Sequence, residues 1–415
     1  MDDLRDRTSE QPKKLDSLFA LYQKLYSEVI VGFMKIYSPS SDHISLDSLL
    51  RGKDLSAIKK VSIYNYTSDD LPDVVLQCKN LESLELIKTR IRQLPDGLNE
   101  LTKLSVIRIY NHRSKHPLKL KKNNYVTSLI IRGGNPKNLP RSYRSFSALK
   151  TLDLAGNFLT RFPQGARRNE DLRELSLQEN RLTLRQRLKK HPYVETLALQ
   201  HNRITRVPAS IRAFISLRKL GFNYNQISSV HRDIRMLTKL ENLSFYHNEL
   251  PLIPSGVYEM EGLREIDLFY NKIETVENRL SQWKNLRMLY LSHNKILSLP
   301  EDIGNLPSLE GLYIWDNRIT RLPEGLGNIK TLRFLWANNN NLLALPRSLF
   351  DLEKMEELDL SHNFLTEIPE SVFDLRRLKI LSLVDNPWND STMQFIPRRA
   401  EELRAKNVFV HIPDK

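Results

Sequence analysis

Histidine is the residue type whose side chain most readily binds a transition metal or transfers a proton near neutral pH. One place in the sequence pattern carries it repeatedly: His201, His247, His293 and His362. Histidines that share a zinc ion hold their nitrogens roughly 3–4 Å apart, because zinc–nitrogen bonds are about 2 Å long. The repeat described below separates these side chains by about 10 Å or more. His112 and His116 lie in a loop without other ligand residues nearby. The sequence therefore predicts no metal site and no cofactor.

Serine precedes histidine twice, at Ser292–His293 and Ser361–His362, and Asp359 lies close to the second pair. A nucleophilic serine needs its general base within hydrogen-bond reach. Neighbouring residues of an extended strand point to opposite faces, and the dipeptide occupies the same place in the pattern both times. Repeat composition explains the two pairs, so no catalytic residue is predicted and we do not expect an enzyme.

The chain has 415 residues, and its single cysteine, Cys78, rules out an intrachain disulfide and favours a reducing compartment. The N-terminal stretch "MDDLRDRTSEQPKK" lacks the basic and apolar regions of a signal peptide. The apolar run "VIVGFM", residues 29–34, is far too short to span a membrane. A cytoplasmic location is expected, and a secreted or surface location if the N-terminus has been trimmed.

The stretch "LYLSHNKILSLPEDIGNLPSL", residues 289–309, changes from strand-like to helix-like spacing halfway, as one unit of a repeat would. Counting from Leu286, positions 1, 4, 6, 9, 11, 14 and 15 are Leu286, Leu289, Leu291, Asn294, Ile296, Leu299 and Pro300. The same template begins at Ile58, Leu81, Leu104, Val126, Leu149, Leu172, Val194, Leu217, Leu240, Leu263, Leu286, Leu309, Leu332, Met355 and Leu378. These 15 units follow one another at steps of 23 residues, except for two steps of 22.

The residue types explain how each unit folds. Positions 4 and 6 point inward from a short strand, and positions 3, 5 and 7 point outward. One unit cannot bury its apolar face, so neighbouring units must stack into a continuous core. Asparagine suits position 9, where the chain turns, because its amide both donates and accepts hydrogen bonds. The return segment is expected to form a short helical or 3-10 turn on the convex side.

The template L-x-x-L-x-L-x-x-N-x-L resembles the leucine-rich repeat signature. It is most similar to the 23-residue intracellular class of Scribble, erbin and the plant Ras-group proteins, over residues 58 to about 388. The resemblance implies an α/β solenoid, a horseshoe of about 15 repeats with a parallel concave β-sheet. It also implies scaffold or adaptor roles, without specifying a partner.

Position 9 is asparagine in eleven consecutive units, from Asn157 to Asn386. Tyr66, Thr89, His112 and Gly134 hold it in the first four units, which should therefore be less regular.

The ends of such an array must be capped. Residues 1–57 are predicted to form a helical N-terminal cap, because one helical stripe holds Leu15, Leu18, Phe19, Tyr22, Leu25, Tyr26, Val29, Ile30 and Phe33. Residues 58–388 form the repeat array. Residues 389–415 are predicted to close the other end, with Trp388 and a helix-like stretch at 397–406.

Some other features are predicted to be structural. The fragment "GLGNIK", residues 325–330, resembles part of a phosphate-binding loop but falls on a convex return segment. Cys78 and Trp283 fill convex core positions, where a buried apolar side chain is expected.

Aromatic side chains gather on the outward strand positions 3, 5, 7 and 8 of units eight to thirteen. They are Tyr224, Tyr246, Phe269, Tyr270, Tyr290, Tyr313, Trp315, Phe334 and Trp336. In units one to seven the same positions hold only Tyr64 and Tyr110. Acidic residues surround the aromatic set: Glu265, Asp267, Asp316, Glu357 and Asp359. An apolar patch of this kind is typical of a binding site. Packing of the rings against each other across strands is the alternative.

Basic charge is concentrated in one segment. Residues 103–192 hold 21 Lys or Arg against five Asp or Glu, whereas the net charge of the whole chain is +14. A basic flank is predicted on the side opposite the strands: Lys115, Lys119, Lys121, Lys122, Arg141, Arg144, Arg167, Arg168, Arg185, Arg187, Lys189 and Lys190. It could meet an acidic protein or an anionic membrane surface. Nucleic acid is not favoured, because no aromatic interleaving or nucleic-acid-binding fold accompanies it. A solvated basic face is the alternative.

The expected function is non-catalytic protein recognition by a scaffold or adaptor that binds a protein partner through the aromatic concave face. One alternative is a bacterial surface or secreted binder of carbohydrate or host peptide, because aromatic rings also stack on sugars. Another is the binding domain of a larger effector enzyme. The array and its caps are expected to occupy the chain to residue 415, which leaves no segment for a catalytic domain.

Overall fold

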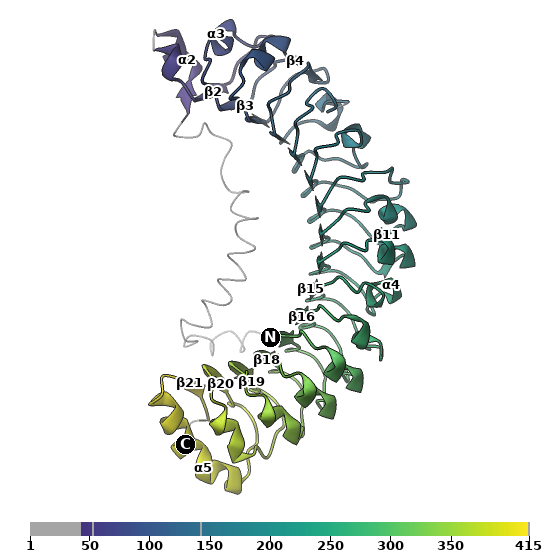
Figure 1. Cartoon of the computed structure of the whole chain (residues 1–415), viewed down its shortest axis with the longest axis vertical. Coiled ribbons are helices and arrows are strands. Elements are labelled where there is room, and N and C mark those ends of the chain that lie inside the picture. Colours follow the sequence, from purple (N-terminus) through teal and green to yellow (C-terminus); the bar gives the residue numbers. More distant parts are fainter. Residues whose placement is uncertain (1–42, 52–53, 142, 414–415) are drawn as a thin grey trace, which may run out of the picture.

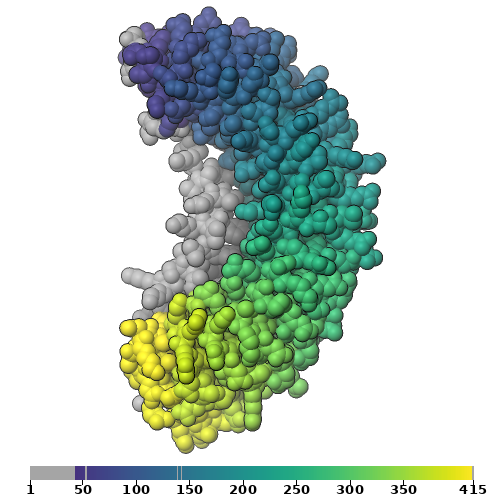
Figure 2. Space-filling view, in the orientation of Figure 1, coloured from purple at the N-terminus to yellow at the C-terminus, as the bar shows by residue number. Residues whose placement is uncertain are grey.

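The computed structural model describes residues 43–51, 54–141 and 143–413. The repeats stack into an arc whose concave side is a continuous parallel β-sheet, with helical turns on the convex side (Figure 1). The space-filling view shows the same arc as a continuous surface (Figure 2). The fold is the predicted α/β horseshoe. The amphipathic stripe at residues 15–36 lies outside the described residues.

The concave sheet has 17 strands in the described residues, each parallel to its neighbours in chain order. They are β1 (Ile44–Ser45), β2 (Lys60–Tyr64), β3 (Ser83–Ile87), β5 (Val106–Tyr110), β7 (Ser128–Arg132), β8 (Thr151–Asp153), β9 (Glu174–Ser176), β10 (Thr196–Ala198), β12 (Lys219–Gly221), β14 (Asn242–Ser244), β15 (Glu265–Asp267), β16 (Met288–Tyr290), β17 (Gly311–Tyr313), β18 (Phe334–Trp336), β19 (Glu357–Asp359), β20 (Ile380–Ser382) and β21 (Phe409–His411). The 15 predicted repeat strands are all present. β1 and β21 add one strand at each end, which the repeat pattern did not predict.

Most return segments form short helical turns. The α-helices are α2 (Leu46–Leu50), α3 (Asp73–Leu76), α4 (Ser255–Tyr258) and α5 (Asp390–Arg404). The 3-10 helices are η1 (Leu55–Ala57), η2 (Asp96–Glu100), η3 (Pro136–Asn138), η4 (Gln164–Ala166), η5 (Ala209–Ala213), η6 (Arg232–Met236), η7 (Leu280–Gln282), η8 (Glu301–Asn305), η9 (Glu324–Asn328), η10 (Arg347–Asp351) and η11 (Glu370–Asp374). Two small parallel sheets join neighbouring return segments: β4 (Gln93–Leu94) with β6 (Lys119–Leu120), and β11 (Arg206–Val207) with β13 (Ser229–Val230).

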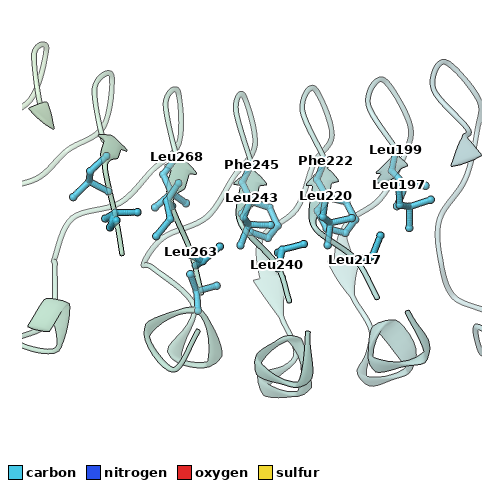
Figure 3. Packing of buried hydrophobic residues seen from close by; sticks show 14 of the residues in the cluster. Leu197, Leu199, Leu217, Leu220, Phe222, Leu240, Leu243, Phe245, Leu263 and Leu268 are labelled. Atoms are coloured by element: carbon cyan, nitrogen blue, oxygen red, sulfur yellow. The ribbon is translucent and has the colours of Figure 1, made fainter. Parts of the chain in front are cut away.

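The core lies between the concave sheet and the convex return segments, and positions 1, 4 and 6 of every unit belong to it. Figure 3 shows these side chains stacked in rows from one unit to the next. Phe222 and Phe245 replace leucine at position 6 of two neighbouring units, and their rings stack with centroids 5.3 Å apart. Apolar residues at fixed places therefore contact their own counterparts in adjacent units, which makes the core continuous.

The asparagines at position 9 join each unit to the one before it. The Nδ2 of Asn271 donates to the carbonyl of Phe245, in the preceding unit, at 2.9 Å and to that of Leu268, in its own unit, at 3.0 Å. Its Oδ1 accepts a hydrogen bond from the backbone N–H of Leu250 at 3.0 Å. Asn317 and Asn363 make the same bonds. The side chain thus satisfies buried backbone groups of two units at once.

A second conformational requirement precedes each asparagine. Position 8 has a positive φ in all 15 units, between 50° and 68°. The residues are Asn65, Lys88, Asn111, Gly133, Gly156, Glu179, His201, Tyr224, His247, Tyr270, His293, Asp316, Asn339, His362 and Asp385. Only glycine adopts this conformation freely, and asparagine, aspartate and histidine tolerate it better than most residues. The recurring histidines are explained by this turn, a reason that sequence analysis missed.

The first four units, predicted to be less regular, lack the asparagine bonds, yet their strands β2, β3, β5 and β7 are five residues long and pair in register. Thr89 and His112 are buried at position 9, and the hydroxyl of Thr89 and both ring nitrogens of His112 have no hydrogen-bond partner among the described residues. Burial lowers the pKa of His112 to about 4. Buried polar groups without partners weaken the packing between these units.

The C-terminal end is covered by a helix and a strand. α5 begins after Asn389, whose side chain accepts a hydrogen bond from the N–H of Thr392 at 2.9 Å, so the helix starts earlier than the predicted 397–406. Trp388 packs against the core and its Nε1 donates to the carbonyl of Leu383 at 3.0 Å. At the other end, the described part of residues 1–57 contributes β1 as well as helical turns, and the division into two caps and an array stays a prediction.

The asparagine bonds can be tested with Asn271→Ala. The change leaves the backbone N–H of Leu250 buried without a partner, and such an unsatisfied group costs about 1–3 kcal/mol. The carbonyl of Phe245 loses one of two hydrogen bonds and keeps the one from Asn248 at 3.0 Å. We expect faster hydrogen exchange in the two adjoining units and a lower melting temperature. Exchange rates equal to those of the unchanged protein would contradict the role assigned to the side chain.

The buried His112 predicts a local loss of stability in acid. Its pKa is about 4 when folded and near 6.5 when unfolded, so the unfolded chain takes up the proton first as the pH falls. Stability from this group is complete above about pH 6.5 and falls by about 3 kcal/mol by pH 4. His112→Asn should reduce the difference between urea unfolding at pH 7 and at pH 4.5. An identical acid dependence in both proteins would contradict this.

Candidate functional site

The nine predicted aromatic residues all lie at concave positions, as the register required. We call them the aromatic layer, and they come from six consecutive units whose strands are β12, β14, β15, β16, β17 and β18 (Figure 1). They are not equally accessible: Phe269 is buried, Tyr270 is 40% exposed and the other seven are half-buried. The layer is therefore a packed surface and not a set of separately projecting rings.

One row of the aromatic layer runs across three neighbouring strands at position 5. Tyr290, Tyr313 and Trp336 are direct partners in the sheet register. The tyrosine rings stack with centroids 4.8 Å apart, and the centroids of Tyr313 and Trp336 are 5.8 Å apart. Asp267 precedes the row on β15 and Asp359 follows it on β19. The row is thus an aromatic segment with a carboxylate at each end.

A second group of rings closes over a serine. Phe269 and Trp315 are at position 7 two units apart, yet their ring centroids are only 5.3 Å apart. Ser292 holds the same position between them and is fully buried, with no hydrogen-bond partner for its hydroxyl among the described residues. The small serine allows the two larger rings to contact each other above it. Their packing keeps water away from this part of the layer.

A third row was not predicted. It alternates histidine and tyrosine at position 8: His201, Tyr224, His247, Tyr270 and His293. Their ring centroids follow at 4.3, 4.9, 5.8 and 3.9 Å, and His293 pairs through Nδ1 with Asp316 at the end of the row. Burial lowers the pKa of His201 and of His293, so these two rings favour the neutral form. The alternation of ring-bearing residues every 23 positions could have indicated the row.

Carboxylates border the C-terminal side of the aromatic layer. The Trp336 indole N–H donates to Glu357 at 3.1 Å, and the Ser361 hydroxyl donates to Asp359 at 2.6 Å. Burial raises the pKa of Glu357 and that of Asp359. Neither carboxylate forms an ion pair with a lysine or arginine in the described part of the chain.

Position 2, at the edge of the sheet, is different because its charges are paired between units. Arg287 lies 2.6 Å from Glu310, and Arg333 lies 2.7 Å from Glu356. Lys379 lies 2.6 Å from the same Glu356. Hydrogen bonding to Arg333 lowers the pKa of Glu356 to about 2. The charges along this edge are therefore paired, whereas the neighbouring Glu357 and Asp359 on the concave face form no ion pair with a lysine or arginine in the described residues.

A polar group on the concave face of the earlier units was also not predicted. Arg132 on β7 forms an ion pair with Asp153 on β8. Nearby, burial raises the pKa of Glu179 to about 7, although the charge of Arg132 opposes this shift. The concave face thus changes from polar and partly basic to aromatic and acidic along the arc.

The basic flank lies on return segments of four consecutive units, outside the concave sheet. Eleven of its twelve predicted side chains are exposed, and Arg167 is half-buried. Apart from Arg144, none of the twelve has a carboxylate within 4 Å among the described residues. Positive charge is therefore concentrated here without the pairing seen at position 2.

The residues considered for catalysis and metal binding do not form such sites in the described residues. The Ser361 hydroxyl donates to Asp359, whereas His362 pairs with Asp385 at 3.1 Å. No three His, Cys, Asp or Glu side chains in the described residues gather as a metal ion would require. "GLGNIK" lies largely in η9, where Gly325 lets neighbouring return segments approach closely.

Two residues predicted to be core are fully buried. Cys78 has no exposed surface, and burial raises the pKa of its thiol. Trp283 stacks on Tyr258 with centroids 5.3 Å apart, and its Nε1 donates to the carbonyl of Val257 at 3.0 Å. Both serve the convex core, as the sequence predicted.

Within the described residues, no helix has the length and apolar character needed to cross a bilayer. The comparison with curated proteins found no match. The family model for the leucine-rich repeat matches residues 239–296, 284–342 and 330–387. None of this separates the 23-residue class of Scribble and erbin from other classes, so that subclass stays a prediction.

Solved structures support the same family. A leucine-rich repeat protein of Leptospira interrogans is 26% identical, with 90% of this chain and 100% of that chain covered and a TM-score of 0.67. An internalin of Listeria monocytogenes is 20% identical, with coverage of 87% and 88% and a TM-score of 0.54. A chain of the Drosophila Toll–Spatzle complex is 19% identical, with coverage of 87% and 55% and a TM-score of 0.66. The last two show likeness of fold alone. The repeat template, the parallel concave sheet and the family match together establish that this chain is a leucine-rich repeat protein.

Proposed function

We propose that this protein is a non-catalytic interaction module, a scaffold or adaptor, that binds a protein partner through the aromatic layer. One observation carries the proposal: nine aromatic side chains occupy concave positions of six consecutive units, while the first seven units hold two. Core packing does not require them, because positions 1, 4 and 6 already supply the buried rows. Tyrosine and tryptophan are enriched among the residues that dominate interface energies.

The rings pack against one another, as the alternative predicted, and this packing is compatible with the binding of a partner. Rings fixed by their neighbours lose little conformational freedom when a partner binds, so a packed layer is a favourable contact surface. A cytoplasmic location is part of the proposal and rests on the single cysteine of the sequence. The separate hydrogen-bond partners of Ser361 and His362 support a non-catalytic role.

The aromatic layer can be tested with Trp315→Ala and Trp336→Ala. Both side chains are half-buried, so each change should cost about 1–2 kcal/mol of stability, against roughly 3–5 kcal/mol for the fully buried Trp283. Each change should lower the affinity for a captured partner about thirtyfold, which corresponds to about 2 kcal/mol of binding free energy. Quantitative pull-downs followed by titration, with melting curves of every variant, provide the measurement.

Phe364→Ala is the matched control, because Phe364 is an aromatic residue of the same array that is 55% exposed and lies outside the layer. Its partner affinity should be unchanged. If Trp315→Ala and Trp336→Ala both keep full affinity while melting normally, the binding site lies elsewhere on the arc.

The basic flank supports a second candidate, binding of an anionic surface. The observation that favours it is that eleven of the twelve side chains are exposed and that, apart from Arg144, none has a carboxylate within 4 Å among the described residues. Like charges that are not neutralised repel one another and attract acidic partners. An anionic membrane and an acidic protein both fit this charge.

Charge reversal tests the flank. Replacement of Lys121, Lys122, Lys189 and Lys190 by glutamate should abolish sedimentation with vesicles that contain phosphatidylserine. Salt should weaken binding of the unchanged protein, because the Debye length falls to about 3 Å at 1 M. Phosphatidylcholine vesicles serve as the neutral control. If the unchanged protein does not bind anionic vesicles at low salt, the membrane version of this candidate is excluded.

A further inference from the structure

The charge on the concave face of the last six units opposes the charge of the whole chain. Positions 3, 5, 7 and 8 of these units hold six carboxylates and no lysine or arginine: Glu265, Asp267, Asp316, Glu357, Asp359 and Asp385. The net charge of the chain is +14. The local excess of negative charge is therefore a property of this surface and not of the composition.

Two of these carboxylates meet the end of the aromatic row. Glu357 accepts from the indole of Trp336 at 3.1 Å, and Asp359 is the register partner of Trp336 on β19. Glu357 is 9% exposed and Asp359 is half-buried. Arg333 and Lys379, whose charges act on Glu357, are held by Glu356 on the adjacent edge, and the basic groups that act on Asp359 are the histidines His362 and His411. Two little-hydrated carboxylates thus lie beside an aromatic ring without a cation of their own.

Burial of a carboxylate without a cation is unfavourable, and that is the physical cause of the raised pKa of both groups. A cation placed here would gain twice. It would neutralise the carboxylates, and it would contact the electron-rich face of tryptophan or tyrosine, which attracts cations best when water is excluded. The same kind of contact already exists at the edge, where the Arg333 guanidinium lies 4.9 Å from the ring centroid of Phe334.

We infer that the partner inserts an arginine or lysine side chain between Trp336, Tyr313, Glu357 and Asp359, as part of a basic peptide segment that lies across β17, β18 and β19. This inference rests on the proposed function, because it specifies the partner of the same aromatic layer. Apolar side chains of the segment would contact the row of tyrosines toward β16, since Tyr290 and Tyr313 present stacked rings there. The carboxylates would provide specificity for a cation, and the aromatic rings would provide most of the contact area.

The probe is a fluorescein-labelled peptide, Gly-Leu-Arg-Leu-Arg-Leu-Gly, and its neutral counterpart has citrulline in place of each arginine. Citrulline keeps the shape and several N–H donors of arginine but lacks the charge. We expect the full-length protein to bind the arginine peptide at least tenfold more tightly at low salt, as measured by fluorescence anisotropy. Equal binding of both peptides, or no binding of the arginine peptide, overturns the inference.

Isosteric variants locate the cation. Glu357→Gln and Asp359→Asn preserve shape, and glutamine can still accept from the Trp336 indole. Each should weaken the arginine peptide at least fivefold and leave the citrulline peptide unchanged. Glu324→Gln makes the same charge change on an exposed residue of the convex η9 and should have less than a twofold effect. Melting curves confirm that each variant is folded. Equal losses for Glu357→Gln and Glu324→Gln overturn the assignment.

The captured partner separates this inference from the proposed function. If Trp315→Ala and Trp336→Ala lose the partner while Glu357→Gln and Asp359→Asn retain it, the cation site is wrong and the aromatic interface stands. If the aromatic variants retain the partner, the proposed function itself fails. If the aromatic variants and the carboxylate variants all lose the partner, the result supports the proposed function and the cation site together.

Discussion

The hydrogen bonds of the position-9 asparagines are the interaction on which the rest of the structure depends. Each side chain spans two units, so the turn of one repeat is fixed by the backbone of another. In the eleven units that carry these asparagines, the fixed turns hold the strands before them in register, and outward side chains of successive units fall into straight rows. This alignment places Tyr290, Tyr313 and Trp336 side by side in the aromatic row.

The left-handed residue before each asparagine is the second constraint, and it connects fold with surface chemistry. Glycine would satisfy it most easily, but the five units from His201 to His293 hold tyrosine or histidine there. A non-glycine residue in this conformation costs about 1–2 kcal/mol. Stacking between neighbouring rings, such as His201 on Tyr224 at 4.3 Å, offsets part of this strain. Position 8 thus carries side chains that the turn alone does not favour.

Most of the fold could be predicted from the sequence, because a period repeated 15 times fixes which residues face inward. The burial of Trp283 and the outward placement of Trp336 both follow from that register. β1 and β21 could not be predicted, since they lie outside the template and gain their pairing only from the sheet edge. The closure of Phe269 and Trp315 over Ser292 was also beyond the pattern, because it depends on side-chain directions across two units. The recurrence of Gly, Asn, Asp and His at position 8 was a signal of the left-handed turn that sequence analysis passed over.

The absence of asparagine from position 9 of the first four units has a consequence for how the chain is made. During synthesis these units leave the ribosome first, and domains generally begin to fold from the N-terminal side. Here the first four units pair through five-residue strands but lack the asparagine bonds, and the hydroxyl of Thr89 and the ring of His112 are buried without partners in the described residues. A solenoid can instead nucleate in any stable stretch and grow outward. The eleven linked units that follow provide one such stretch, so assembly of the array need not follow the direction of translation.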